Sequence, residues 1–174
     1  MIERDFKSFE YKDITVPAEK ASLYLDCYEN FDWTEDENFP YRNKGVKLTF
    51  RLKRDRKILN KMELTHLQRH FEAYVEEIAK YEGEIEAGPR NKSIILGLIG
   101  TGFMAGATFA VTAPTPIIWL TILLGIPGFI GWGAPMVVYN RLKATQEEKI
   151  RPRIEEKYEE IFTLCEKGHG LLSI

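Results

Sequence analysis

One stretch of this chain carries no charged side chain, and it constrains the fold more than any other feature. No Asp, Glu, Lys, Arg or His occurs between Ser93 and Asn140, although 29% of the whole sequence is charged. Placing one charge at the centre of a bilayer helix costs roughly 3 kcal/mol on insertion scales. A soluble protein would have to cover this stretch with an apolar shell, and the remaining segments are too highly charged to supply one. We therefore expect a membrane-embedded segment.

Two closely spaced prolines divide this uncharged stretch. Pro114 and Pro116 lie in the run Ala113-Pro114-Thr115-Pro116, and a single helix does not continue through such a pair. Residues 93–112 and 117–140 each supply enough apolar chain to cross a hydrocarbon core of about 30 Å. The pattern predicts a transmembrane helical hairpin with a very short turn.

Basic residues flank the predicted hairpin where it joins the rest of the chain. Arg90 and Lys92 precede it, Arg141 and Lys143 follow it, and the turn is uncharged. Because basic flanks stay in the cytoplasm, we expect a multi-pass protein of the cell inner (plasma) membrane with both termini cytoplasmic. The mixed charge of the first seven residues predicts neither a secretory signal nor a transit peptide.

The residues before the hairpin indicate a small cytosolic α+β module over residues 1–59. Strands are expected at three places, residues 10–16, 31–34 and 46–53, and the last of these shows the alternation of apolar and polar residues typical of a strand with one buried face. Pro17 suits the first position of a helix that reaches about Asn30. Turn-forming residues are dense over 38–45, where we expect a loop.

Two amphipathic helices are expected on either side of the hairpin. The first is a stalk over residues 60–88, capped by Asn60 and Glu63, with a heptad seam formed by Leu64, Leu67, Phe71, Tyr74, Ile78, Tyr81 and Ile85. Gly88-Pro89 is expected to interrupt it. The second, over residues 143–174, is expected to pack antiparallel on the stalk. The predicted fold class is α+β: a β-α-β-β-α module, a transmembrane hairpin and a C-terminal amphipathic helix.

Small residues indicate where the spanning helices pack. Glycines at four-residue spacing let helix backbones approach closely in lipid, and the candidate helix-packing or oligomerisation positions are Gly97, Gly102, Gly106, Gly125 and Gly128. Two small-residue faces on the first span would leave one for the second span and one for another copy or another membrane protein. The alternative, weighted equally, is that these glycines only accommodate the hairpin and its lipid.

The second span is rich in helix breakers between Gly125 and Pro135. This density predicts a kink or local unwinding, and broken helices line substrate paths in some transporters. However, no acidic, basic or imidazole side chain lies in either span to bind an ion or relay a proton. A kinked structural helix is therefore the favoured interpretation.

Two groups of polar residues outside the spans are possible sites. Glu63, His66 and His70 share a helix face at metal-ligand spacing, but the sequence offers no fourth ligand, so we interpret them as surface residues and assign no metal. The densest basic run is a possible contact for anionic lipid or a partner, and comprises Arg51, Lys53, Arg54, Arg56 and Lys57. A solvated strand face is the favoured alternative for it.

Several functional classes are not supported by the sequence. It contains no glycine-rich phosphate loop, nucleophile elbow, paired-cysteine metal motif, or kinase or protease signature, so we expect neither an enzyme nor a bound cofactor. The formal net charge of −2 argues against nucleic-acid binding. Cys27 and Cys165 fall in segments placed in the cytosol, where thiols stay reduced, and we expect no disulfide.

Three segments carry a resemblance to known proteins. Phe31-Asp32-Trp33, the run from Leu52 to Lys57, and the glycine-rich hairpin ending in Gly131-Trp132 resemble small bacterial membrane proteins with a cytosolic N-terminal module and a two-helix transmembrane hairpin. The resemblance implies a bacterial inner membrane and transfers no site. The leading hypothesis is a membrane-anchored adaptor or regulatory protein that presents its cytosolic module to a partner. The alternative is a small homo-oligomeric channel or transporter subunit.

Overall fold

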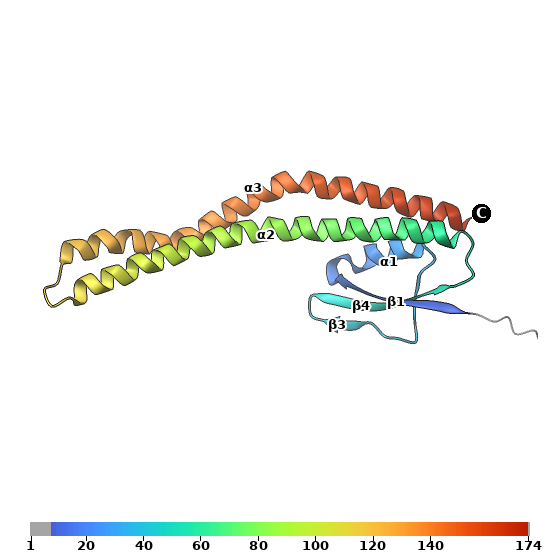
Figure 1. The fold of residues 1–174 in the computed structure, drawn as a ribbon, viewed down its shortest axis with the longest axis horizontal. Helices are drawn as coiled ribbons and strands as arrows, with labels where there is room; N and C mark the ends of the chain where they lie inside the picture. The colour runs from blue at the N-terminus through green and yellow to red at the C-terminus, as the bar shows by residue number, and fades with distance from the viewer. Residues whose placement is uncertain (1–7, 174) are drawn as a thin grey trace, which may run out of the picture. The chain divides into compact units, whose positions relative to one another are not determined.

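The computed structural model describes residues 8–173 and contains a mixed α+β fold with two long helices (Figure 1). The chain divides into two compact units. One comprises the residues up to Glu76 together with Glu156 and the residues after it, and the other comprises Glu77–Glu155. Each unit is described separately below.

The first unit contains a small antiparallel sheet centred on one strand. Strand β4, Lys47–Asp55, pairs along its whole length with β1, Phe9–Pro17. On its other edge β4 pairs with two short strands, β2, Thr34–Glu35, and β3, Arg42–Lys44. Both long strands were predicted, and the alternation in β4 is confirmed, because Phe50 and Leu52 are buried together with Ile14 and Val16 of β1 on one face of the sheet.

The weaker sequence signals for this unit are only partly confirmed. Strand β2 begins at Thr34, where the predicted strand ends, because Asp32 adopts a left-handed conformation with φ 64° and turns the chain. The buried side chains of Phe31 and Trp33 anchor that turn. Residues 38–45 were expected to be a loop, yet they include β3. The expected helix after Pro17 is a 3-10 turn, Ala18–Lys20, followed by helix α1, Ala21–Glu29.

The core of the first unit lies between the sheet, α1 and parts of both long helices, α2, Lys61–Thr112, and α3, Ile118–Leu172. The Phe71 ring of α2 meets the rings of Tyr24, Tyr28 and Phe31 at centroid distances of 6.3, 5.2 and 5.7 Å. Near the end of α3, a Cβ placed on Gly168 would lie 2.7 Å from the Asn30 carbonyl oxygen. Both amphipathic stripes therefore contact α1 and the residues after it, which the sequence did not predict.

The heptad seam of α2 is confirmed at every seventh residue. Leu64, Phe71, Ile78 and Ile85 are buried, as a stripe of period 3.5 requires when it faces a neighbouring element. The intervening positions Leu67, Tyr74 and Tyr81 are only half-buried. The sequence therefore located the seam correctly and overestimated how completely it is covered.

The predicted helix break at Gly88-Pro89 is wrong. Helix α2 continues through Pro89, and α3 likewise continues through Pro127, Pro135 and Pro152. A proline inside a helix removes one backbone hydrogen bond, whereas ending the helix would leave several N–H and C=O groups without partners. The second predicted span is therefore not unwound, and it continues into the predicted C-terminal amphipathic helix as one element.

The second unit is a hairpin of α2 and α3, and the predicted turn at Ala113-Pro114-Thr115-Pro116 is confirmed. The Ile117 N–H donates to the Ala110 carbonyl at 3.1 Å, and the Thr121 N–H donates to the Ile117 carbonyl at 3.1 Å. These two bonds close the turn and start α3. The two helices then pack against each other through glycine, alanine and methionine.

Candidate functional site

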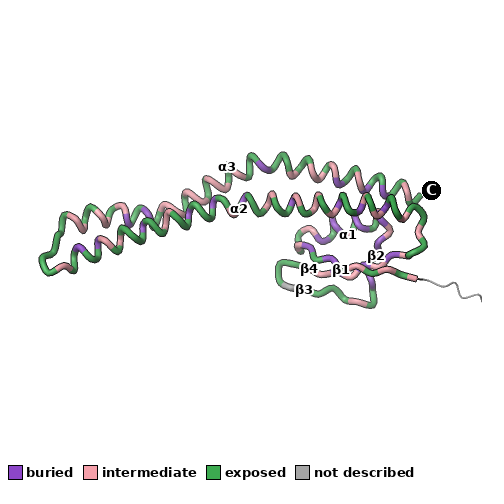
Figure 2. Tube along the Cα trace, in the orientation of Figure 1, coloured by how far each residue is buried: buried purple, intermediate pink, exposed green. Residues whose placement is uncertain are grey.

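The most distinctive surface of the molecule is an apolar belt on the second unit, formed by residues 93–140. Both helices contain a stretch long and apolar enough to cross a membrane, and only 17% and 11% of those stretches are buried. Figure 2 shows this part of α2 and α3 mainly as exposed and intermediate positions. Large apolar side chains that are exposed here include Ile94, Leu98, Phe109, Trp119, Leu123, Phe129 and Met136.

Threonine hydroxyls and an indole within the belt are paired inside the hairpin, whereas the buried Ser93 hydroxyl at the start of the belt has no hydrogen-bond partner among the residues that the structure describes. The hydroxyls of Thr101, Thr108, Thr112 and Thr121 each donate to the carbonyl four residues earlier, at 2.8 to 3.2 Å. The Trp132 indole N–H donates to the Thr101 hydroxyl at 3.3 Å. These hydroxyls therefore need no water as a hydrogen-bond partner. Polar groups in an apolar solvent must be paired within the protein in this way.

The two helices approach most closely at a pair of glycines. A Cβ placed on Gly100 would lie 2.7 Å from the Gly131 carbonyl carbon, and one on Gly131 would lie 2.5 Å from the Gly100 Cα. Backbone therefore packs on backbone, and no side chain fits between. Neither glycine was among the predicted packing positions. The buried residues Ser93, Ala107 and Ala110 lie on the same side of α2 as Gly100. Small residues at steps of three and four from Ser93 could therefore have identified Gly100 as a packing position from the sequence.

The five predicted packing glycines have different environments. A Cβ on Gly128 would meet Met104 at 2.7 Å, on Gly106 it would meet Leu124 at 3.3 Å, and on Gly97 it would meet Pro135 at 3.7 Å. These three positions belong to the contact between α2 and α3. Gly102 and Gly125 have nothing within 4 Å of such a Cβ, so they face open space.

An open apolar groove of about 390 Å³ lies beside this contact. It is lined by Met104, Ala107, Thr108, Val111, Thr121, Ile122, Gly125, Ile126 and Phe129. Because Gly125 contributes only backbone to its wall, no side chain narrows the groove at that position.

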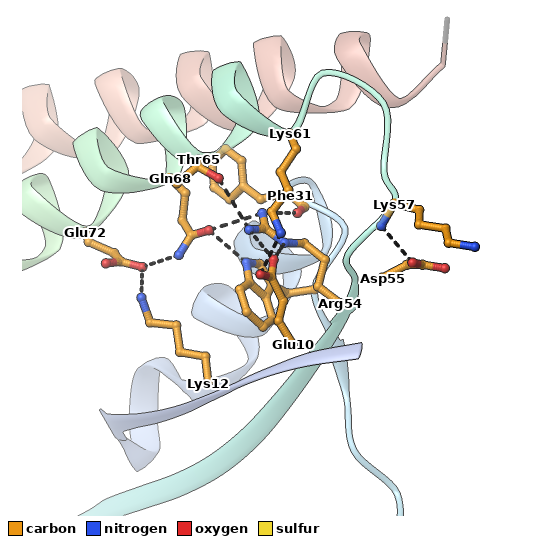
Figure 3. Close-up of polar contacts among 11 residues, drawn as sticks. Glu10, Lys12, Phe31, Arg54, Asp55, Lys57, Lys61, Thr65, Gln68 and Glu72 are labelled. Atoms are coloured by element: carbon orange, nitrogen blue, oxygen red, sulfur yellow. Dashed lines mark hydrogen bonds and ion pairs between the residues drawn. The ribbon is translucent and has the colours of Figure 1, made fainter. Parts of the chain in front are cut away.

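The predicted basic run does not form a single surface, because Arg54 points into the first unit. Its side chain is only 3% exposed and forms an ion pair with Glu10 at 2.6 Å. The guanidinium also donates to the Phe31 carbonyl at 3.3 Å and lies 4.5 Å from the Trp33 ring centroid. Figure 3 shows Arg54 of β4 between Glu10 of β1 and the α2 residues Thr65 and Gln68, which also accept hydrogen bonds from its guanidinium. Arg54 is therefore a core residue and has no exposed surface for lipid.

A polar chain continues from Arg54 along α2. Gln68 accepts a hydrogen bond from the Trp33 indole at 2.8 Å and donates to Glu72 at 2.7 Å. Glu72 also accepts hydrogen bonds from the Lys12 ammonium, which Figure 3 shows, and from the Tyr28 hydroxyl. Burial favours a raised pKa for Glu72, but the hydrogen bonds from Lys12 and Gln68 outweigh burial and lower its pKa. The network ties α2 to the sheet.

The other members of the basic run lie on the outer side of the sheet and the following turn. Arg51 pairs with Asp13 at 2.8 Å, and Lys53 lies 3.9 Å from Asp36. Arg56 and Lys57 are exposed after β4. Arg51 also lies 3.8 Å from the Phe39 ring centroid.

Arginine and aromatic side chains together form a distinct surface, which we call the arginine–aromatic face: Tyr11, Phe39, Arg42 and Arg51. Arg42 and Arg51 contact the same Phe39 ring, at 4.8 and 3.8 Å from its centroid. Tyr11 is 59% exposed and lies opposite Lys53 in the β1–β4 register. Exposed tyrosine and arginine are the residues most enriched where proteins bind one another.

The three residues considered as metal ligands are only partly brought together. His66 and His70 are exposed on α2, and their Nε2 atoms lie 3.3 Å apart. Over residues 8–173 no group of three or more His, Cys, Asp or Glu side chains is arranged to hold a metal ion. Glu63 is therefore not a third member of such a group.

The two cysteines are both free and buried in the first unit. A hydrogen bond with Cys165 and burial together raise the pKa of the Cys27 thiol far above its usual value. The sequence did not predict that residues 27 and 165 would be neighbours.

Comparison with protein-family models, with curated proteins and with solved structures finds no match for this chain. The class that the fold defines is a small α+β domain joined to a long helical hairpin with an exposed apolar belt.

Proposed function

We propose that this chain is an integral membrane protein whose hairpin, residues 93–140, spans the bilayer and anchors the α+β domain in the cytoplasm. The observation that carries the proposal is the apolar belt, in which as little as 11% of a membrane-length stretch is buried. A soluble monomer rarely exposes a contiguous apolar patch above about 300–600 Å². The internal pairing of the threonine hydroxyls supports the same conclusion.

The basic residues that flank the hairpin support its proposed orientation in the membrane. Arg90, Lys92 and Arg141 are exposed at the end of the belt away from the turn, and Lys143 pairs with Glu86 at 3.4 Å. Basic residues beside a span remain on the cytoplasmic side, so both termini are cytoplasmic and the turn at Thr115 crosses to the other side.

Cysteine labelling in intact cells tests this topology. The native thiols are buried, so a cysteine introduced at an exposed position is the reactive one. Thr115→Cys should react with a membrane-impermeant maleimide from outside, and Ser173→Cys should react only after permeabilisation. Recovery of the chain in the soluble fraction, or labelling of Ser173→Cys in intact cells, would disprove the topology.

Within that topology, we infer an adaptor role in which the arginine–aromatic face binds a cytosolic protein. This face combines exposed aromatic surface with two guanidinium groups, and it lies on a sheet that is fixed to α2 by the bonds of Arg54 to Thr65 and of Lys12 to Glu72. A rigid platform of this kind loses little side-chain entropy on binding.

Site-specific photo-crosslinking tests the adaptor role. A photoreactive amino acid at Tyr11 should give a discrete protein adduct in cells, and that adduct should disappear when Arg42 is replaced by alanine. The matched control is the same probe at Met62, which is more exposed than Tyr11 and lies outside the face. Equal adducts at both positions, or no adduct at Tyr11, would contradict the role.

The second candidate function is a subunit of a homo-oligomeric channel or transporter, and the apolar groove at Gly125 favours it. A neighbouring copy's helix in this groove would make Gly125 a contact residue. Gly125→Leu should then convert an oligomer into a monomer in nanodiscs, measured by mass, while Gly133→Leu, also in open space, should not. A monomeric wild-type chain would remove this candidate.

A further inference from the structure

Two histidines form a pair on the exposed side of α2 that the proposed membrane function does not use. His66 and His70 are one helical turn apart, and their ring centroids lie 4.6 Å from each other with an interplanar angle of 64°. Their Nε2 atoms are 3.3 Å apart. Residues four apart on a helix lie on the same face, so the helix itself holds the pair in place.

The nitrogen separation matches the requirement of a tetrahedral metal. Zinc binds imidazole nitrogen at about 2.0–2.1 Å, and two such bonds at a tetrahedral angle place their nitrogens about 3.3–3.4 Å apart. The only other described interaction for this pair is a hydrogen bond between the two rings. An exposed hydrogen bond contributes little, because water competes for both groups. A metal ion bound to both nitrogens would stabilise the pair more, because two coordinate bonds would replace the single hydrogen bond between the rings.

We propose that His66 and His70 are a two-histidine site for a divalent transition-metal ion of the zinc class. Imidazole nitrogen suits zinc, nickel and copper ions, whereas magnesium and calcium select oxygen ligands. Since no third His, Cys, Asp or Glu of the described chain joins the group, water fills the remaining positions. The site is therefore open and exchangeable, unlike a closed structural zinc site with four protein ligands.

Zinc titration of the untagged full-length chain in detergent micelles tests this site. The readout is histidine-selective NMR, and the chain's third histidine, His169, provides an internal reference. Zinc ion alone should shift the ring resonances of His66 and His70 together and saturably, and should leave those of His169 in place. Magnesium ion at the same concentration should shift none of them.

Single substitutions complete the test, and all three positions are exposed, so the variants should fold. H66Q and H70Q should each abolish saturable zinc binding, because one imidazole cannot chelate. H169Q should bind zinc as the wild type does. The proposal is overturned if H66Q or H70Q keeps wild-type affinity, if H169Q loses binding, or if wild-type resonances do not move at millimolar zinc. These outcomes do not depend on whether the hairpin spans a membrane.

Discussion

Gly100 and Gly131 hold the two long helices in direct backbone contact. A side chain as small as alanine at Gly131 would place its Cβ 2.5 Å from the Gly100 Cα, a distance that only movement of a helix could relieve. The contact thus depends on the absence of two β-carbons. It is the tightest point of the hairpin among the glycines that the structure describes.

Substitution at this contact should weaken the hairpin. Gly131→Ala should lower the free energy of unfolding by about 1–3 kcal/mol, the usual cost of overpacking. Gly133→Ala is the matched control, because its Cβ would meet nothing within 4 Å, and it should be neutral or stabilising by about 1 kcal/mol through helix propensity. Denaturation in mixed micelles, followed by circular dichroism, measures both. Equal stabilities for the two variants would contradict the backbone contact.

The buried arginine should matter more to stability than its exposed neighbour. Arg54→Met leaves the Phe31 carbonyl without its guanidinium donor and leaves Glu10 with Lys61 as its remaining cationic partner. Because the Phe31 carbonyl and the Gln68 side chain lose a buried donor, the substitution should cost about 1–3 kcal/mol. Arg51→Met removes an exposed pair with Asp13 and a contact with the Phe39 ring, and because solvent screens such a pair, this substitution should destabilise the fold less than Arg54→Met. Urea unfolding of the two variants should show this order, and the reverse order would refute the assignment of Arg54 to the core.

The pH dependence of stability should reflect Glu72. Burial favours a higher pKa, but the hydrogen bonds from Lys12 and Gln68 prevail, so the folded-state pKa lies below its ordinary 4.5. A carboxyl with a lowered folded pKa stabilises the fold above the unfolded pKa, and this contribution is lost as pH falls through the folded pKa. Stability should therefore decrease as the pH falls below about 4.5.

Two variants test this contribution independently. Glu72→Gln removes the titrating group, and Lys12→Met removes its cationic partner. Both should reduce the dependence of the unfolding free energy on pH in the acid range, compared with the wild type. An acid profile that is identical in all three proteins would exclude Glu72 as its source.

The native thiols should be chemically silent in the folded protein. The hydrogen bond between the two thiols and burial raise the pKa of Cys27, so very little of its nucleophilic thiolate is present. The same hydrogen bond lowers the pKa of Cys165, but burial keeps that thiol from the reagent. Maleimide at neutral pH should leave the folded wild type unmodified by mass, label a Ser173→Cys variant once, and label both native cysteines only after unfolding. Rapid labelling of Cys27 in the folded wild type would show that the thiol is accessible.

The parts of the fold with a strong local signal could be predicted from the sequence. Strand β4 follows from alternation, the seam of α2 from heptad spacing, and the hairpin turn from Pro114 and Pro116. The break expected at Pro89 was wrong because a helix loses only one hydrogen bond at a proline, and neighbouring turns maintain the rest. Strand β3 pairs through the backbone of residues whose side chains favour turns, so their composition concealed it.

The candidate sites were harder to predict because they depend on which residues meet in space. Arg54 belongs to a basic run in the sequence, but the alternation of β4 turns it inward while Arg51 and Lys53 face outward. Gly100 and Gly131 lie on different helices, and only the arrangement of the hairpin brings them together. Cys27 and Cys165 are distant in the chain for the same reason. His66 and His70, by contrast, are local, and their spacing alone placed them on one face.

The hydrogen bond from the Ile117 N–H to the Ala110 carbonyl leaves little of the chain between α2 and α3 in an extended form. Proteases bind their substrates as extended strands through backbone hydrogen bonds, and the two prolines of this turn have no N–H to donate to such bonds. In the proposed topology, a protease added outside the cell would find no segment to cut. The protein would keep its full length during surface digestion that shortens neighbours with longer external loops.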